Sequence, residues 1–178
     1  MLMTLDGLEN PPDVVGEEGA FVHSWGKADA TFEREDQWRS SLDFMSRLKK
    51  SSQAYFAHVK IDPGESGIDN WGKPFTFRQA LWYALGSYLL GNDGNDYFFF
   101  SGKSRYGKKD WWFNEYSSID LGKPAGPYQV NLHDGNNIYY REFANGYVYV
   151  NPTSNDAKGI NLRGKCRQLS AENLNKKR

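Results

Sequence analysis

Three short apolar segments that alternate with two long helical patterns constrain the fold of this chain more than any other feature. The apolar segments are Asp13–Gly16, Ala54–Ile61 and Asp96–Ser101, and the helical patterns cover about Glu33–Lys50 and Phe77–Leu90. Apolar residues recur at spacings of three and four in the first helical pattern, and nearly all the way round the second. Strand, helix, strand, helix, strand is the order of two consecutive parallel βαβ units. We therefore predict three neighbouring parallel strands.

The chain after the third apolar segment follows a different pattern. Residues 102–127 form a loop rich in Gly, Pro and aromatic residues, and so long a loop in a compact domain is usually functional. Ile138–Phe143 and Tyr147–Asn151 then alternate in polarity around Asn145-Gly146, which is the strongest short-range signal for a β-hairpin. We predict this hairpin, with a positive φ in its Asn-Gly turn, and Ile160–Leu162 as a further strand.

Composition argues against several classes of function. Lys+Arg and Asp+Glu both number 22, so the chain lacks the basic excess that predicts nucleic-acid binding. No stretch approaches the ~20 apolar residues of a membrane-spanning helix. Cys166 is the only cysteine and the three histidines are not at metal-ligand spacing, so we expect no catalytic metal. Nothing matches a Walker or G-x-G-x-x-G pattern, and we expect no cofactor.

Glu17 and Glu18 stand where the first predicted strand ends and its loop begins. In α/β folds the loops after the carboxyl ends of parallel strands carry the ligand or the chemistry. Side chains alternate between the two faces of a strand, so only one of these glutamates can point into a site at that edge. The alternative is a pair of solvated surface acids.

Polar and aromatic residues in the loops after the predicted strands are candidates for substrate binding. His23 and Trp25 follow the first strand, and Asp62 ends the second. An indole ring stacks on a sugar ring, and polar groups form hydrogen bonds with its hydroxyls. Trp25 has the alternative of packing on the scaffold, and Asp62 that of starting a turn.

The densest aromatic cluster lies in the long loop. Trp111, Trp112 and Tyr116 are candidates for substrate binding there, and Glu115 is a less well-placed second acid. Exposed aromatic residues on a loop need a partner, which is either a ligand or the scaffold. His58 lies within an apolar strand, where a structural histidine is the commoner case.

Several stretches of the chain resemble a known family. They are Asp13–Phe21, the helix that contains Trp38, Tyr97-Phe98, Asp120–Pro124 and Tyr140–Thr153. Together they resemble the C-terminal half of a group of hypothetical glycoside hydrolases, and the similarity covers nearly all of residues 14–162. Its most specific parts are the sequence LGKP and the pattern R-x-F-x-NG-x-V-x-VNP.

The resemblance implies an α/β fold with part of a (β/α)8 TIM barrel, distantly similar to the barrels of retaining glycosidases, followed by a small antiparallel hairpin element. Residues 1–128 would then be the C-terminal part of the barrel, residues 129–165 the antiparallel element and residues 166–178 a basic flexible tail. The acid at the end of the "EEGAF"-like strand resembles an active-site residue of the family. It falls on Glu18, with Glu17 as the second choice.

The resemblance also implies a function, hydrolysis of O-glycosidic bonds in an oligo- or polysaccharide. A TIM barrel takes about 250 residues and eight strands, so we expect a truncated barrel whose second acid lies upstream and whose open edges favour self-association. The 178-residue chain alone would then show no hydrolysis. The alternative is a non-catalytic carbohydrate-binding or inactive remnant of a barrel enzyme. We expect no nucleic-acid and no membrane partner.

Overall fold

The computed structural model of the chain describes residues 10–23, 31–61, 66–68, 72–101 and 112–157. In chain order its helices and strands are β1 (Val14–Glu18), β2 (Val22–His23), β3 (Thr31–Phe32), α1 (Glu35–Lys50), β4 (Ala54–Lys60), β5 (Ser66–Ile68), β6 (Pro74–Thr76), α2 (Phe77–Gly91), β7 (Tyr97–Ser101), α3 (Glu115–Ser118), β8 (Gln129–His133), β9 (Asn136–Phe143) and β10 (Gly146–Val150).

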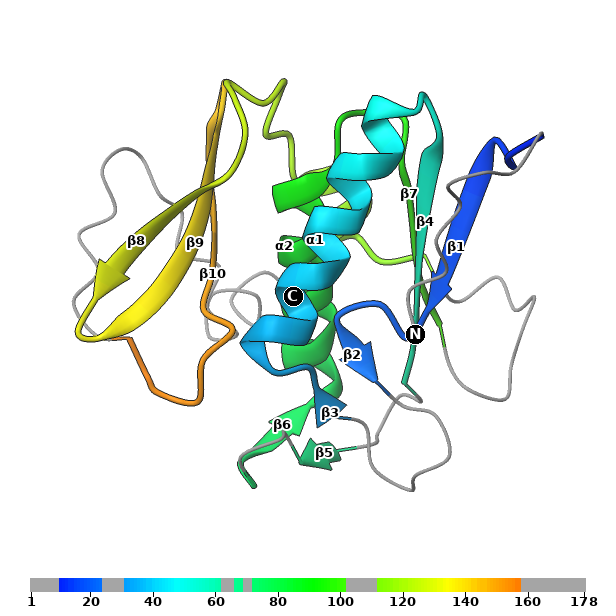
Figure 1. The fold of residues 1–178 in the computed structure, drawn as a ribbon. Helices are drawn as coiled ribbons and strands as arrows, with labels where there is room; N and C mark the ends of the chain where they lie inside the picture. The colour runs from blue at the N-terminus through cyan, green and yellow to red at the C-terminus, as the bar shows by residue number, and fades with distance from the viewer. Residues whose placement is uncertain (1–9, 24–30, 62–65, 69–71, 102–111, 158–178) are drawn as a thin grey trace.

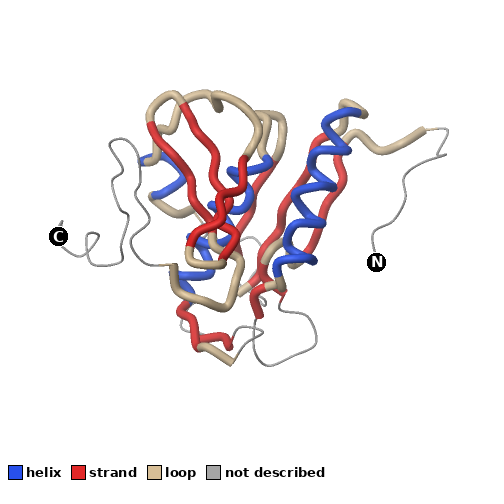
Figure 2. The backbone as a smooth tube through the Cα atoms, turned by 60° about the vertical axis from the view of Figure 1, so that its left-hand side comes forward, coloured by secondary structure: helices blue, strands red, loops and turns tan. Residues whose placement is uncertain are grey.

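The elements form three layers (Figures 1 and 2). A parallel sheet of order β1-β4-β7 forms one outer layer, and an antiparallel sheet of order β10-β9-β8 forms the other. Helices α1 and α2 lie between the two sheets. Two short hairpins, β2–β3 and β5–β6, follow the carboxyl ends of β1 and β4, toward the bottom of Figure 1.

The predicted parallel strands are confirmed. β1 pairs with β4 in the register Val14↔Ala54, and β4 pairs with β7 in the register Phe56↔Tyr97, both parallel. Each connection runs through a helix, because parallel neighbours need a crossover long enough to return the chain to the same end of the sheet.

The predicted partial TIM barrel is wrong. The structure is a small mixed α/β fold with one parallel and one antiparallel three-stranded sheet, and the described residues form no closed barrel. The physical reason lies after β7, where short turns join the strands. Such turns allow only antiparallel pairing, so the second sheet packs on the helices instead of extending the first. In the described part of the chain β1 and β7 are edge strands, and self-association through them stays a prediction.

Each helix carries its own start signal. α1 begins with Glu35 and Asp36, whose negative charges are favourable at the positive end of the helix dipole. α2 begins with a capping box, in which the Thr76 hydroxyl accepts from the Gln79 backbone N–H and the Gln79 side chain accepts from the Thr76 backbone N–H. None of the helices described is both long and apolar enough to cross a membrane.

The helices pack closely on each other. Trp38 of α1 is fully buried and donates its indole N–H to Ser87 of α2 at 2.7 Å. Gly91 at the end of α2 faces Met45, and a Cβ at position 91 would lie 2.6 Å from the Met45 sulfur. The small residue therefore leaves room for the Met45 side chain where the two helices approach.

The predicted β-hairpin is confirmed, with β9 and β10 paired antiparallel in the register Phe143↔Gly146. The predicted positive φ is wrong, since neither Asn145 nor Gly146 has one. The further strand of this sheet is β8, whereas Ile160–Leu162 lies outside the described residues. Asp134 and Gly135 turn β8 into β9 with φ of 48° and 75°, and such an Asp-Gly pair is itself a hairpin signal.

The antiparallel sheet docks on the helices through buried groups. The Tyr139 ring meets the Trp38 ring edge-on, with centroids 4.6 Å apart. The Arg141 guanidinium, in a residue only 5% exposed, donates to the backbone oxygens of Leu89 at 3.1 Å, Asn92 at 2.6 Å and Gly126 at 2.8 Å. Arg141 therefore ties this sheet to the C-terminal end of α2, where carbonyl groups have no partner within the helix.

Candidate functional site

The two glutamates at the end of β1 leave the strand on opposite faces of the parallel sheet. Glu17 points toward α1, where it accepts hydrogen bonds from the hydroxyls of Ser41, at 3.2 Å, and Tyr55. Glu18 points to the face that α1 and α2 do not cover, and its carboxylate lies 3.2 Å from the Lys60 ammonium. The Glu18 side chain is 53% exposed, whereas that of Lys60 is only 7% exposed.

Buried polar groups continue from Lys60 across the carboxyl ends of the strands. Strand alternation puts His58 of β4 and Ser101 of β7 on the same face as Glu18. A ring nitrogen of His58, Nε2, lies 2.9 Å from the Ser101 hydroxyl, and both residues are buried. Burial, with Lys60 nearby, lowers the pKa of His58, so this imidazole is neutral at neutral pH.

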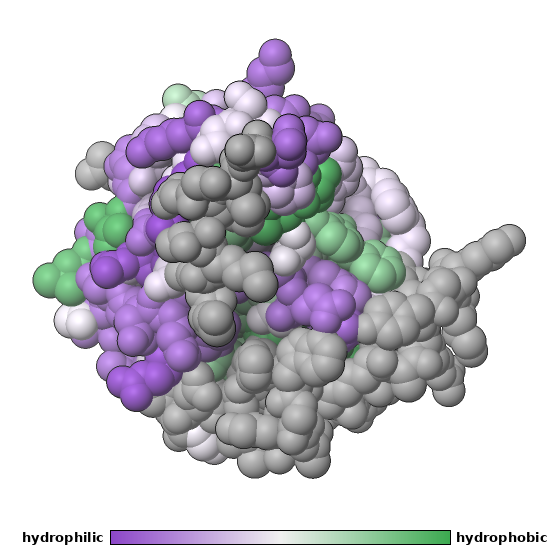
Figure 3. Space-filling view, turned by 45° about the vertical axis from the view of Figure 1, so that its right-hand side comes forward, coloured by the Kyte–Doolittle hydropathy of each residue, from purple (hydrophilic) through white to green (hydrophobic). Residues whose placement is uncertain are grey.

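The β1 side of the molecule carries both polar and apolar surface (Figure 3). When this side is turned forward, green hydrophobic surface adjoins a purple hydrophilic patch. Mixed surface of this kind is common on folded proteins and does not by itself indicate a ligand.

A second carboxyl group approaches Glu17 on the helix side of the sheet. Glu33, just before α1, is largely buried, and its Oε2 atom has no hydrogen-bond partner among the described residues. Burial, reinforced by the negative charge of Glu17, raises the pKa of Glu33 from 4.5 to about 7. Glu17 and Glu33 are therefore a carboxyl pair with different environments, as in acid–base pairs of enzymes. No local pattern predicts this pair, because in the sequence Glu33 is an ordinary polar residue just before a helix.

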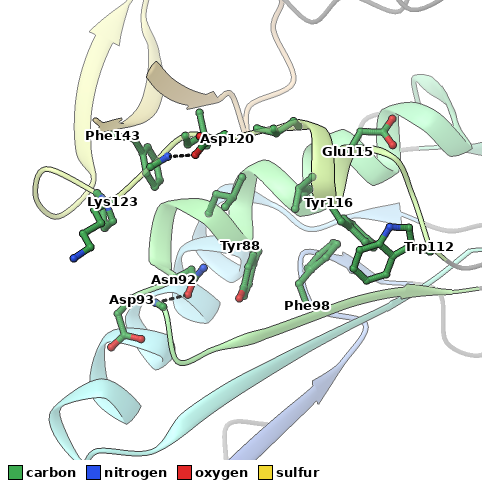
Figure 4. A pocket seen from close by; sticks show the side chains of 17 residues that line it. Tyr88, Asn92, Asp93, Phe98, Trp112, Glu115, Tyr116, Asp120, Lys123 and Phe143 are labelled. Atoms are coloured by element: carbon green, nitrogen blue, oxygen red, sulfur yellow. Dashed lines mark hydrogen bonds between the residues drawn. The ribbon is translucent and has the colours of Figure 1, made fainter. Parts of the chain in front are cut away.

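A groove of about 910 Å³ lies at the other end of the parallel strands, beside the C-terminal end of α2 (Figure 4). Its wall includes Phe98 of β7, Tyr116 of α3 and the exposed ring of Trp112. Glu115, next to Tyr116, is only 4% exposed and pairs with Arg78 at 2.7 Å. The volume is within the range of small-molecule sites, about 300–1,000 Å³.

Comparison with known protein families gives a match over most of the chain. Residues 16–147 match the family model of hypothetical glycosyl hydrolase family 15, and this range is most of the chain. The chain belongs to hypothetical glycosyl hydrolase family 15. The resemblance inferred from the sequence motifs is thereby confirmed. No curated protein matches the chain significantly.

The residues of this family member that we expected in one site are distributed over the fold. Trp25, Asp62 and Trp111 lie outside the described residues, and His23 belongs to β2. Trp112 and Tyr116 line the groove and not the end of the sheet where Glu18 lies. Glu18 is on β1, at the opposite edge of the sheet from β7, and on the face away from the helices. The groove and Glu18 are therefore two separate places on this glycosyl hydrolase family member.

The site at Glu18 is suited to hydrogen bonding and acid–base chemistry. One exposed carboxylate, a buried ammonium and a neutral imidazole bonded to a hydroxyl meet at the carboxyl ends of the three strands. Within the described residues, no group of three or more His, Cys, Asp or Glu side chains is arranged to hold a metal ion.

Proposed function

We propose that this member of the glycosyl hydrolase family acts on an oligo- or polysaccharide by hydrolysis of an O-glycosidic bond, with Glu18 as one of the two reacting carboxyl groups. The observation that carries the proposal is the position of Glu18. Its half-exposed carboxylate stands at the carboxyl end of a parallel strand, held by a buried lysine, in a chain of this family. That edge is where α/β enzymes gather their catalytic groups.

Glycoside hydrolysis needs two carboxyl groups in different roles. One donates its proton to the departing glycosidic oxygen, and the other, as a carboxylate, acts on the anomeric carbon directly or through a water molecule. The ion pair with Lys60 fits Glu18 to the carboxylate role, because it balances that charge and fixes one oxygen. The other oxygen remains available to the sugar.

Neighbouring groups would orient the substrate. The buried pair of His58 and Ser101 lies on the same face as Glu18 and would support the polar surface that the sugar meets there. Asp62 follows this cluster directly along the chain, and we propose it, with His23 and Trp25, as substrate-binding residues. Glu18 is the only carboxyl group that the described strands present on this face.

Glu17 is the second candidate for the catalytic acid. Its carboxylate is held by Tyr55 and Ser41 and faces Glu33, whose raised pKa suits a proton donor near neutral pH. A reaction on this side of the sheet would require the sugar to enter between β1 and the start of α1.

The experiment compares glutamate-to-glutamine variants, which keep shape and hydrogen bonding but remove the titratable carboxyl group. We would assay release of reducing ends from a panel of glycans by this chain and by a longer member of the same family. In whichever of the two proteins hydrolyses a glycan, we expect Glu18→Gln, or the matching change in the longer protein, to lower turnover by orders of magnitude with an almost unchanged thermal midpoint.

The two candidates are distinguished by the matched variant Glu17→Gln. Near-normal turnover in Glu18→Gln contradicts the proposal, and a loss confined to Glu17→Gln moves the chemistry to the helix side of the sheet. This chain and the longer family member could also bind glycans without hydrolysing any of them. That result would favour the alternative function, non-catalytic carbohydrate binding.

A further inference from the structure

The groove beside α2 is separated from Glu18 by the parallel sheet itself. It opens on the helix side, near the amino end of β7, whereas Glu18 lies at the carboxyl end of β1 on the opposite face. We propose that this groove is a second carbohydrate-binding site, which holds a neutral oligosaccharide chain against the ring of Trp112. This inference takes carbohydrate as the class of ligand from the proposed function, whereas the groove itself is argued from the structure.

The wall of the groove is built by the two sequence stretches that carry the family resemblance. The LGKP stretch and the β9–β10 hairpin are joined by three backbone hydrogen bonds of 2.9 Å, from Ala144 N to Lys123 O, from Asn145 N to Leu121 O and from Ala125 N to Glu142 O. The tight approach requires Gly122, which has a φ of 69°; a Cβ there would lie 2.9 Å from the Cβ of Ala144. The wall is therefore fixed in place before any ligand arrives, which reduces the entropic cost of binding.

The aromatic side of the groove offers a platform. Trp112 is 69% exposed, and its only ring partner among the described residues is Tyr116, which it meets edge-on at 5.4 Å. The faces of the indole are thus not occupied by that contact. Tyr116 in turn is held by Phe98 and Phe113, at 5.9 and 5.6 Å. A large exposed ring on a supported scaffold is accessible to a partner, and a pyranose presents a flat C–H face to such a ring.

Polar groups stand on the other side of the groove, as Figure 4 shows. Asp120 uses its Oδ1 atom for the Gly122 backbone N–H at 3.0 Å, and its Oδ2 atom has no partner in the described part of the chain. Asn92 similarly accepts from Gly94 N–H with Oδ1 and keeps its amide N–H groups for a ligand. One acceptor and one donor opposite an aromatic platform match a sugar hydroxyl edge and ring face.

Charge narrows the class of ligand. Asp93 and Asp120 line the groove with Lys123, and Asp93 also lies 3.7 Å from the Lys49 ammonium, outside the groove. A polysaccharide of uronic acids would place further carboxylates beside these two, whereas a neutral glycan meets them as hydrogen-bond acceptors. We therefore assign the groove to neutral glycans.

The test is native gel electrophoresis of the intact chain in gels that contain soluble xylan, glucomannan, hydroxyethylcellulose or polygalacturonate. We expect at least one neutral polysaccharide to retard the chain and polygalacturonate to leave its mobility unchanged. Trp112→Ala should lower the affinity for the polysaccharide, measured from the retardation at several polysaccharide concentrations, about tenfold, because a stacking partner is lost. Trp112→Phe, which keeps an aromatic ring, should retain most of the native affinity.

Tyr97→Ala is the matched control, because Tyr97 is a 57% exposed ring on the other face of the sheet. This variant should bind as the native chain does. The inference is overturned if no neutral polysaccharide retards the native chain, or if Trp112→Ala binds as well as native. It is also overturned if Trp112→Ala has a lower thermal midpoint and Trp112→Phe, with a native midpoint, shows no recovery. Loss of binding only in Glu18→Gln would likewise overturn it, while supporting the proposed site at Glu18.

Discussion

Glu33 makes the stability of this fold depend on pH in a way that one substitution can isolate. Its carboxyl group is largely buried beside Glu17, and burial raises its pKa from 4.5 to about 7. At 1.36 kcal/mol for each pKa unit, the difference is worth about 3 kcal/mol at most. Since the side chain keeps some contact with solvent, we expect about 2 kcal/mol.

The sign follows from proton binding. Below pH 4.5 both the folded and the unfolded chain keep the Glu33 proton, and the group adds no pH dependence. Between pH 4.5 and about 7 the unfolded chain has lost the proton but the folded chain retains it, so the free energy of unfolding falls as the pH rises. Above about 7 the folded chain holds a buried carboxylate and the full cost is present.

Glu33→Gln removes this cost, because the amide is neutral at every pH. We expect the variant and the native chain to be about equally stable near pH 4.5, and the variant to be more stable by about 2 kcal/mol at pH 8. Urea unfolding followed by far-UV circular dichroism at pH 5, 6, 7 and 8 measures the difference. Glu142→Gln, at an exposed glutamate of β9, controls for the loss of one negative surface charge.

The reasoning fails if the stability difference between Glu33→Gln and the native chain is the same at pH 5 and pH 8. It also fails if Glu142→Gln reproduces the pH dependence of the difference, since that would indicate a long-range charge effect. Glu17→Gln should give a smaller change in the same direction, because Glu17 is the lesser cause of the raised pKa.

Two further substitutions test the packing that shapes the groove. Arg141→Met should lower the free energy of unfolding by about 2–4 kcal/mol, because it leaves the carbonyls of Leu89, Asn92 and Gly126 without their donor. Arg141→Lys should lower it by less. A urea midpoint of Arg141→Met equal to that of the native chain would contradict this role of Arg141. Gly122→Ala should cost about 1–3 kcal/mol, from the positive φ and the contact with Ala144. Gly126→Ala, where a Cβ meets nothing within 4 Å, is its matched control, and equal thermal midpoints for the two variants would refute the prediction.

The local elements of this fold could be predicted from the sequence because their signals are local. Apolar segments of strand length between two helical patterns gave the parallel strands, and Asn145-Gly146 gave the position of the β9–β10 hairpin. The turn between β8 and β9 has an equally good signal in Asp134-Gly135, which the prediction missed.

Closure of the sheet could not be predicted in the same way. The barrel followed from the family resemblance and from the order of the elements, but neither determines how many strands lie side by side. Pairing beyond β7 depends on contacts distant in sequence, such as Trp38 with Tyr139 and Arg141 with the end of α2. These contacts place an antiparallel sheet on the helices, and no periodicity in the chain reports them.

Contacts distant in sequence also explain why the residues predicted to share one site lie in two places. Glu18, Trp112 and Tyr116 were grouped because all follow predicted strands, and in a closed barrel such loops share one end. In this structure α3 lies on the helix side of the sheet, where Tyr116 packs on Phe98, the second residue of β7. The aromatic residues therefore lie near the amino end of the strands, while Glu18 stays at the carboxyl end with Lys60. The proposed binding groove and the proposed reacting carboxylate lie at opposite ends of one sheet, and if both act on carbohydrate, the ligand is a long polymer rather than a small sugar, because only a polymer can reach both.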